Sequence, residues 1–237
     1  MLTVVMLNWA RPEYVLHNMN RYATYNIVES VFCFNNGPAL KYSGSLPPKC
    51  NLIESSKDLG LYSRFATASL ARTQAIFHTD DDLWVPECTL DALYAAWQCA
   101  PSSCHGLHGR NVYRGYERKN VYGSVEVVLT RAVICSRDVN NTALSAARFF
   151  EDMQAEPVGN GEDIVLSFAA MSSSCVLNRS YNLPSYNHPC YGEADSDRTT
   201  TEIHLRWSGH FAHRTQVVER CREVFHMKEP LSDTVNS

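Results

Sequence analysis

The sequence predicts a single α/β domain with a mostly parallel sheet flanked by helices, followed by a smaller antiparallel half. Three observations predict this fold class. Residues 1–90 alternate between strand-like and helix-like segments, which is typical of a parallel sheet with helical crossovers. From residue 104 the chain becomes rich in Gly, Tyr and β-branched residues, which favours antiparallel strands and loops. No internal repeat, low-complexity block or clear linker divides the 237 residues, so we expect one domain.

The first part of the chain is expected to contain four strands and three helices. Residues 2–9 form a continuous apolar and β-branched run, which indicates a strand buried on both faces of a sheet. Pro12 suits the first turn of the helix that follows. The apolar residues between Leu61 and Leu70 have near-helical spacing. The expected strands are 2–9, 27–36, 50–56 and 75–82, and the expected helices are 13–23, 61–74 and 86–99.

The second part is expected to begin with strands and to end with helices. Apolar residues at helical spacing, with acids in a first turn, indicate a helix that starts near Glu162. Clusters of Asn, Asp, Pro and Gly indicate turns before the last helix. We expect antiparallel strands and a loop in 104–136, helices at 142–153, 160–175 and 206–225, and a turn-rich segment at 180–202.

The composition excludes several functional classes. Hydrophobic residues make up 45% and charged residues 19%, as in an ordinary folded protein with a sizeable core. A net charge of −4 provides no basic field for nucleic acid or for an anionic membrane surface. No apolar run is long enough to span a bilayer, and the start of the chain does not resemble a signal peptide. We therefore expect a cytoplasmic protein, or a lumenal one if a targeting segment precedes this sequence.

The nine cysteines are scattered singly, without a C-x-x-C pair. That spacing argues against a zinc ribbon, and the odd number argues against a disulfide scaffold. We expect reduced thiols, although one bridge between distant cysteines remains compatible with the sequence.

Polar residues follow the predicted strands at the points where the strands end. Arg11 follows the first strand, Asn35 and Asn36 end the second, and the Asp80–Asp82 triplet ends the fourth. Because ligands of open α/β sheets bind outside the carboxyl ends of the strands, these side chains are expected to meet at one edge. This convergence is the first argument for a functional site.

The Asp triplet suits a cation-binding role. Carboxylates are hard oxygen ligands, which favour Mg²⁺ or Mn²⁺ over Zn²⁺. The alternative is a solvated turn, or acids that interact with the dipole of the helix that begins near Pro86. Three like charges crowded at a sheet edge repel one another, which favours the functional interpretation.

Glu162 and Asp163 form a second acidic site. The structural interpretation is that they offset the helix dipole, with Asn160 as the N-cap. The functional one is a carboxylate that faces a reacting hydroxyl, as a base or as a stabiliser of an oxocarbenium-like transition state.

Three arginines, Arg11, Arg64 and Arg214, suit bidentate contact with phosphate, although a single Arg is more often a solvated surface residue. The sequence lacks a P-loop, a G-x-G-x-x-G fingerprint and a G-x-S-x-G nucleophile elbow.

The order of five motifs resembles a known family. The motifs are LNWARPEY, FCFNNGP, FHTDDD, GNGEDIVLSF and HFAHRTQVVERC, and the resemblance extends from Val4 to Cys221. This order resembles the GT-A glycosyltransferases, most closely the catalytic domain of the exostosin-like family, whose members use UDP-sugars with Mn²⁺ and retain the anomeric configuration. The resemblance implies a GT-A-type, Rossmann-like domain with a nucleotide-binding half (1–103), an acceptor-binding half (104–225) and a tail (226–237).

The resemblance also implies roles for individual residues. It assigns nucleotide contacts to Arg11, Arg64 and one of the two asparagines, Asn35 or Asn36. Asp80 and Asp81 would face uridine and ribose, and Asp82 would bind Mn²⁺ or Mg²⁺ at the diphosphate. The implied catalytic residues are Asp163, with Glu162 beside it, near the anomeric carbon, and Arg214 at the departing diphosphate. The family's Asn upstream of the arginine appears here as Leu59 or Asp58, and residues 104–131 match poorly, so the acceptor, a glycan or glycolipid, is not identified.

Several alternatives stay open at this point. If Asp163 deprotonates the acceptor hydroxyl, the transfer inverts the anomeric configuration. If the acceptor attacks from the side of the leaving group, the configuration is retained. The resemblance favours this second course, because the Asp triplet and the late His-Arg pair both follow the exostosin-like pattern. A nucleotidyltransferase would be expected to carry a Gly-rich loop and a Lys near the N-terminus, which are absent. A non-catalytic carbohydrate-binding or scaffold protein on the same fold is the remaining alternative.

Overall fold

The fold is known from a computed structural model, which describes residues 1–9, 11–37, 39–40, 45–113, 115–117, 119–153, 160–187 and 209–227. None of the helices in this described part combines the length and apolar composition that crossing a bilayer requires.

The described residues form one large sheet with the strand order β3-β2-β1-β4-β10-β6-β11-β8. The first four strands in this order pair in parallel, whereas β10 runs antiparallel to both β4 and β6. Beyond β6, strand β11 pairs in parallel and β8 is antiparallel to it. The strands are β1 (Leu2–Asn8), β2 (Val28–Asn35), β3 (Cys50–Glu54), β4 (Ala75–Asp80), β6 (His105–Gly106), β8 (Gly123–Val125), β10 (Ala132–Ser136) and β11 (Asn178–Ser180).

Two short antiparallel pairs complete the strands. They are β5 (Leu83–Trp84) with β12 (Tyr186–Asn187), and β7 (Gly109–Arg110) with β9 (Val127–Val128). The predicted fold class, an α/β domain with a mostly parallel sheet, flanking helices and a smaller antiparallel part, is confirmed. The finer division into halves at residues 103 and 225 stays a prediction.

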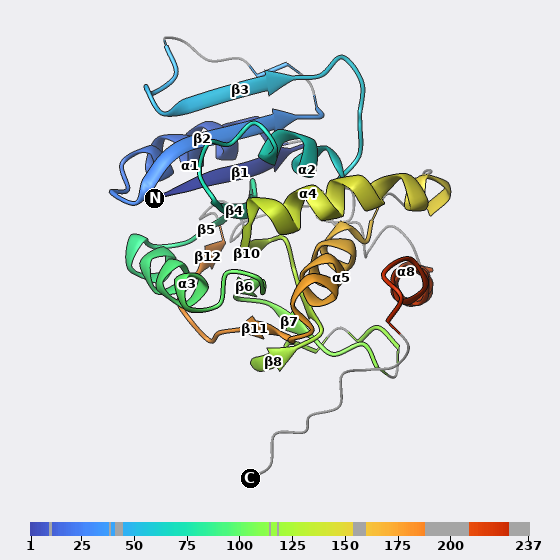
Figure 1. The fold of residues 1–237 in the computed structure, drawn as a ribbon. Coiled ribbons are helices and arrows are strands. Elements are labelled where there is room, and N and C mark those ends of the chain that lie inside the picture. Colours follow the sequence, from blue (N-terminus) through green and yellow to red (C-terminus); the bar gives the residue numbers. More distant parts are fainter. Residues whose placement is uncertain are drawn as a thin grey trace.

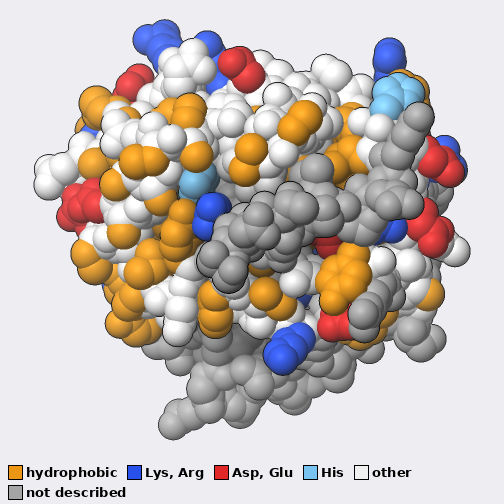
Figure 2. All heavy atoms as spheres, turned by 60° about the horizontal axis from the view of Figure 1, so that its bottom comes forward, with side chains coloured by type: hydrophobic (Ala, Val, Ile, Leu, Met, Phe, Trp, Pro, Cys, Tyr) orange, Lys and Arg blue, Asp and Glu red, His pale blue; other side chains and the backbone are white. Residues whose placement is uncertain are grey.

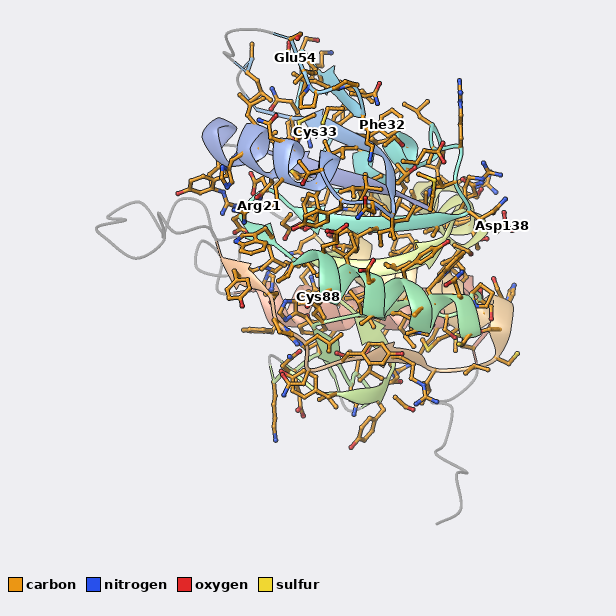
Figure 3. The ribbon with its side chains drawn as sticks, turned by 90° about the vertical axis from the view of Figure 1, so that its left-hand side faces the viewer. Arg21, Phe32, Cys33, Glu54, Cys88 and Asp138 are labelled. Atoms are coloured by element: carbon orange, nitrogen blue, oxygen red, sulfur yellow. The ribbon has the colours of Figure 1, made fainter. Side chains whose placement is uncertain are left out.

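Helices cover both faces of the sheet (Figure 1). They are α1 (Pro12–Ala23), α2 (Ser63–Ala68), α3 (Glu87–Cys99), α4 (Arg137–Ala146), the 3-10 helix η1 (Ala147–Met153), α5 (Glu162–Ser174) and α8 (His210–Val224). Figure 3 views the molecule from the side of α1 and α3, which carry Arg21 and Cys88, respectively. The other face of the sheet is covered by α2, α4 and α5, with α8 packed outside α5.

Alternate residues of each central strand enter two separate hydrophobic clusters. In β1, Val4 and Met6 belong to the cluster with α1 and α3, whereas Val5 belongs to the cluster with α2, α4 and α5. All residues of β1 are buried, as the continuous apolar run predicted for a strand covered on both faces. The two clusters fix the sheet, and with it the carboxyl ends of β1 and β4.

Two of the predicted helices have different bounds in the structure. The helix expected at 61–74 is only Ser63–Ala68, because the chain turns at Ser69 to enter β4 at Ala75. Leu70, the last residue of the near-helical spacing, lies beyond this helix and is 57% exposed. The helix expected at 142–153 begins earlier, at Arg137, where the Ser136 side chain accepts a hydrogen bond from the Val139 N–H and caps it.

The other predictions differ little from the structure where it describes them. The closing helix expected at 206–225 is α8, and residues 206–208 lie outside the described residues. The turn-rich segment 180–202 is described as far as residue 187. The cysteines of the described part are free thiols, as expected; Cys190 lies outside it.

Figure 2 shows the face that lies at the bottom of Figure 1. Hydrophobic side chains are interspersed there with backbone and other uncharged side chains, and the described Lys and Arg side chains are spread over the face.

Candidate active site

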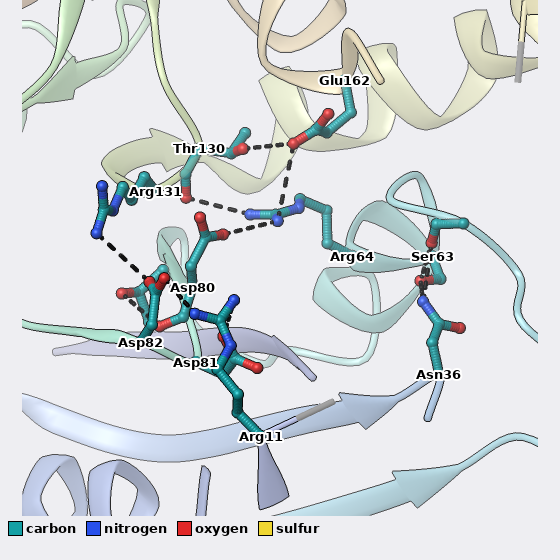
Figure 4. Close-up of polar contacts among 12 residues, drawn as sticks. Arg11, Asn36, Ser63, Arg64, Asp80, Asp81, Asp82, Thr130, Arg131 and Glu162 are labelled. Atoms are coloured by element: carbon teal, nitrogen blue, oxygen red, sulfur yellow. Dashed lines mark hydrogen bonds and ion pairs between the residues drawn. The ribbon is translucent and has the colours of Figure 1, made fainter. Parts of the chain in front are cut away.

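The carboxyl ends of β1 and β4 bring Arg11 and the Asp triplet together, as predicted. The two strands are parallel neighbours, with Leu7 opposite Asp80. Arg11 Nη1 lies 2.5 Å from Asp82 Oδ2, and Arg11 Nη2 lies 3.2 Å from Asp81 Oδ1 (Figure 4). A guanidinium with its planar fork therefore spans two carboxylates of the triplet.

Arg131 adds a second guanidinium at Asp82. Its Nη2 lies 3.6 Å from Asp82 Oδ1. The antiparallel register of β10 with β4 places Ala132 opposite Thr79, so the residue before β10 reaches the triplet. We call Arg11, Asp81, Asp82 and Arg131 the rim cluster.

The carboxyl group of Asp81 is buried, with 3% of the residue exposed. Burial raises its pKa to about 8; Arg11 and the Trp9 N–H act in the opposite direction, and repulsion from Asp82 and Asp80 adds to the rise. The Asp81 backbone carbonyl accepts a hydrogen bond from Asn18 Nδ2 at 2.8 Å. Asp81 therefore anchors the turn after β4, whereas Asp82 and Asp80 are more accessible.

Arg64 connects the triplet to the second acidic site. This side chain of α2 is 2% exposed, and its Nη2 lies 3.0 Å from Asp80 Oδ1 and 3.7 Å from Glu162 Oε1. Its Nη1 donates to the Thr130 backbone carbonyl at 3.1 Å. The Thr130 hydroxyl in turn donates to Glu162 Oε1 at 2.7 Å (Figure 4).

Asp163 and Arg214 form an ion pair inside the protein, with 5% of each side chain exposed. Arg214 Nη2 donates to Asp163 Oδ2, and its Nη1 donates to the Asn160 side-chain carbonyl. The guanidinium carbon of Arg214 lies over the Tyr116 ring, 4.2 Å from the ring centroid. Burial alone would lower the pKa of Arg214, but the Asp163 carboxylate raises this pKa by more than burial lowers it. The guanidinium therefore stays charged. We call Asp163 and Arg214 the buried pair.

The N-terminus of α5 is built differently from the prediction. Asn160 is not the N-cap, because Gly161 occupies that position with φ of 122°, a conformation that suits glycine. A Cβ at residue 161 would also lie 3.0 Å from both methyl carbons of Val217. This turn aims the Asn160 side chain at Arg214 rather than at the helix N-terminus.

Asn35 and Asn36 are occupied by contacts within the protein. Asn35 Oδ1 accepts hydrogen bonds from Asn8 Nδ2 at 2.7 Å and from the Gly37 N–H at 3.1 Å. Asn36 Oδ1 accepts from the Leu59 N–H at 3.0 Å, and its Nδ2 donates to the Gly60 carbonyl at 3.1 Å. Both asparagines thus shape the loops beside β2, and the nucleotide contact assigned to one of them stays a prediction.

The sequence interpretation missed four residues of the site. Thr130 and Arg131 lie in the region that matched the resemblance poorly, and their place depends on the β4–β10 register. Asn160 and Tyr116 contact Arg214. The sequence carries no signal for these contacts beyond the proximity of Asn160 to the acidic pair.

The carboxylates at the sheet edge meet only part of what a divalent cation requires. In the described part of the chain, no group of three or more His, Cys, Asp or Glu side chains is arranged to hold a metal ion. Mg²⁺ and Mn²⁺ at substrate phosphates need only one or two protein carboxylates, with phosphate and water oxygens completing the shell. Asp82, at the sheet edge and 13% exposed, fits such a shared site but not a site made by protein ligands alone.

A comparison with protein families identifies the chain at the level of a family. Residues 2–236 match the model of the glycosyl transferase family 64 domain. No curated protein matches the chain. The narrower resemblance to exostosin-like enzymes stays a prediction. With a family match over nearly its whole length, the chain belongs to glycosyl transferase family 64 and is a glycosyltransferase.

Proposed function

We propose that this glycosyltransferase moves a sugar from a UDP-sugar to a hydroxyl of a glycan or glycolipid acceptor, with Mn²⁺ or Mg²⁺ at Asp82 and with retention of configuration. The observation that carries the proposal is the rim cluster, where two guanidinium groups and the Asp82 carboxylate meet at 2.5 and 3.6 Å at the carboxyl edge of the sheet. Such an edge is where open α/β sheets bind nucleotides.

The rim cluster suits a diphosphate leaving group. A sugar nucleotide is already activated, so catalysis consists largely of stabilising the charge on the departing UDP. Arg11 and Arg131 can turn from Asp82 toward phosphate oxygens, which a guanidinium binds in bidentate fashion. A divalent cation shared by Asp82 and the phosphates would supply further positive charge there.

The buried pair suits a fixed negative charge near the reacting sugar. Asp163 Oδ2 accepts from Arg214, and Oδ1 accepts from the Ile164 N–H at 2.9 Å. A carboxylate held on both oxygens favours electrostatic stabilisation of an oxocarbenium-like transition state. The alternative, Asp163 as the base of an inverting transfer, requires one of these oxygens to receive a proton.

Calorimetry with UDP in the presence of Mn²⁺, and with EDTA in its place, tests the donor and the metal together. We expect UDP binding that depends on the metal and weakens at least about tenfold in Asp82→Asn, because a neutral amide is a poor ligand for a hard cation. Asp91→Asn, an exposed acid on α3, serves as the matched control and should leave binding unchanged.

Three results would contradict the proposal. The first is equal UDP binding with and without the metal, and the second is tighter binding of CTP or ATP than of UDP. The third is a protein that binds free sugars but binds no nucleotide.

A screen for hydrolysis of UDP-glucose, UDP-galactose, UDP-N-acetylglucosamine and UDP-N-acetylgalactosamine with Mn²⁺ would then identify the donor. Proton NMR of the first-formed sugar tests the stereochemistry. The α anomer from an α-linked donor agrees with retention, whereas the β anomer supports the inverting alternative.

A further inference from the structure

Arg64 occupies a position that a nucleotide ligand does not readily reach. With 2% of its side chain exposed, it is among the largest fully buried side chains of the described residues. Its two terminal nitrogens already contact three groups, which are the Asp80 carboxylate, the Thr130 carbonyl and the Glu162 carboxylate. A direct phosphate or base contact would have to form inside the protein beside these groups, because so little of the side chain is exposed.

The three contacts come from separate parts of the chain. Asp80 ends β4, Thr130 lies two residues before the start of β10, and Glu162 is the first residue of α5. A guanidinium can bridge them because its donors diverge in one plane, whereas an ammonium group is a compact point charge. Figure 4 shows Arg64 between Asp80 and Glu162, with Thr130 beside Glu162 and in contact with both Glu162 and Arg64.

Glu162 depends on this network for its position. Only 5% of the residue is exposed, and a buried carboxylate is costly unless it is paired and hydrogen-bonded. Its Oε1 faces Arg64 and accepts from the Thr130 hydroxyl, and its Oε2 accepts from the Gly161 N–H at 3.3 Å. The carboxylate is therefore fixed beside Asp163, at the first turn of α5.

Asp80 is the opposite end of the same network and is open to ligand. Its side chain is 37% exposed, against 6% for that of Glu162. Because one nitrogen of Arg64 serves both carboxylates, a ligand that engages Asp80 acts on the group that holds Glu162.

We propose that Arg64 is a positioning residue that couples Asp80, on the donor side, to Glu162, on the sugar side. The inference rests on the proposed function and assigns Arg64 a role other than the nucleotide contact that the resemblance implied.

Arg64→Gln is the principal test, because the amide is neutral and too short to span both carboxylates. We expect the turnover of UDP-sugar hydrolysis to fall by at least about 30-fold, with the affinity for UDP and Mn²⁺ changing less than about threefold. Arg64→Lys keeps the charge but not the fork, so its turnover should lie between those of wild type and Arg64→Gln.

Glu162→Gln and the double variant show whether Arg64 acts through Glu162. Residues that act as a unit are non-additive. We therefore expect Arg64→Gln combined with Glu162→Gln to be no slower than Glu162→Gln alone. Arg137→Gln, which loses a contact to the Ala71 carbonyl away from the network, is the matched control and should leave turnover and affinity unchanged.

Two outcomes would overturn the inference. A tenfold or larger loss of UDP affinity in Arg64→Gln at unchanged turnover would make it a direct nucleotide contact. Additive effects of the two substitutions on turnover would separate Arg64 from Glu162.

If the wild type binds no UDP, the proposed function fails. The coupling of Arg64 to Glu162 is then judged by urea unfolding of the wild type, Arg64→Gln, Glu162→Gln and the double variant. Non-additive stabilities would then still support the Arg64–Glu162 coupling, and additive stabilities would reject it.

Discussion

The rim cluster and the buried pair use the same chemical groups in different surroundings. In the rim cluster the Arg11 and Arg131 side chains are 21% and 34% exposed, and Asp82 is 13% exposed. In the buried pair both side chains are 5% exposed. Solvent at the exposed rim lowers the cost of separating its charges, whereas Arg214 and Asp163 are buried and separating them would leave a charge away from water. The rim therefore suits exchange of partners with a ligand, and the buried pair suits a charge that stays in place.

The largest expected effect comes from breaking the buried pair. Arg214→Met removes the cation and leaves Asp163 buried without its partner, so the free energy of unfolding should fall by about 3–5 kcal/mol. The same change at the rim, Arg131→Met, should cost about 1 kcal/mol or less, because Asp82 retains Arg11 and solvent. Urea denaturation of both variants measures the difference, and equal losses would abolish the distinction between the two regions.

The next effect concerns turnover. Asp163→Asn keeps the shape of the side chain but removes its charge, and we expect the turnover of UDP-sugar hydrolysis to fall by about 100-fold or more. UDP affinity should change less than about threefold, since Asp163 is paired with Arg214 and is not part of the rim cluster. Wild-type turnover in this variant would remove Asp163 from the mechanism.

A smaller effect is expected on donor affinity. Arg131→Met should weaken UDP binding in the presence of Mn²⁺ by about tenfold, the magnitude of one charge-assisted hydrogen bond. The loss should shrink as salt is raised, because exposed charges are screened. Arg179→Met, an exposed residue of β11, is the control for the change in net charge. An equal effect of both variants in a calorimetric titration would mean that Arg131 acts only through the overall field.

A further expected effect concerns the pH dependence of stability at the strand beneath the rim. His78 of β4 is fully buried, and burial, with repulsion from Arg64, lowers its pKa to about 3, despite the Asn140 side chain acting in the opposite direction. The unfolded chain therefore binds a proton that the folded chain does not, between pH 6.5 and 3. The stability that neutral His78 contributes is complete above pH 6.5 and is lost as the pH falls through this window.

His78→Phe should flatten this dependence by up to about 1.4 kcal/mol per pH unit. Urea denaturation from pH 4.5 to 7.5 measures the slope, which a change in packing alone would not alter. Parallel curves for the two proteins would show that other groups carry the acid sensitivity.

The fold followed from the sequence to a large extent. The apolar run of β1 and the alternation of strand and helix gave the parallel part because burial on two faces leaves a local pattern. The length of α2 did not follow, because the spacing of its apolar residues continues after the chain has turned toward β4. The N-cap of α5 was assigned to Asn160 from its residue type, whereas the packing of Val217 against Gly161 selects glycine there.

By itself the sequence determined that acids and arginines follow strand ends and that a second acidic pair opens a late helix, because both features depend on neighbours along the chain. Only the tertiary structure decided which arginine meets which acid. Arg11 and Asp82 are 71 positions apart, and Arg214 and Asp163 are 51 apart. Their pairing depends on sheet order, on the register of β10 with β4 and on burial, and these are properties of long-range packing that no local pattern of residues encodes.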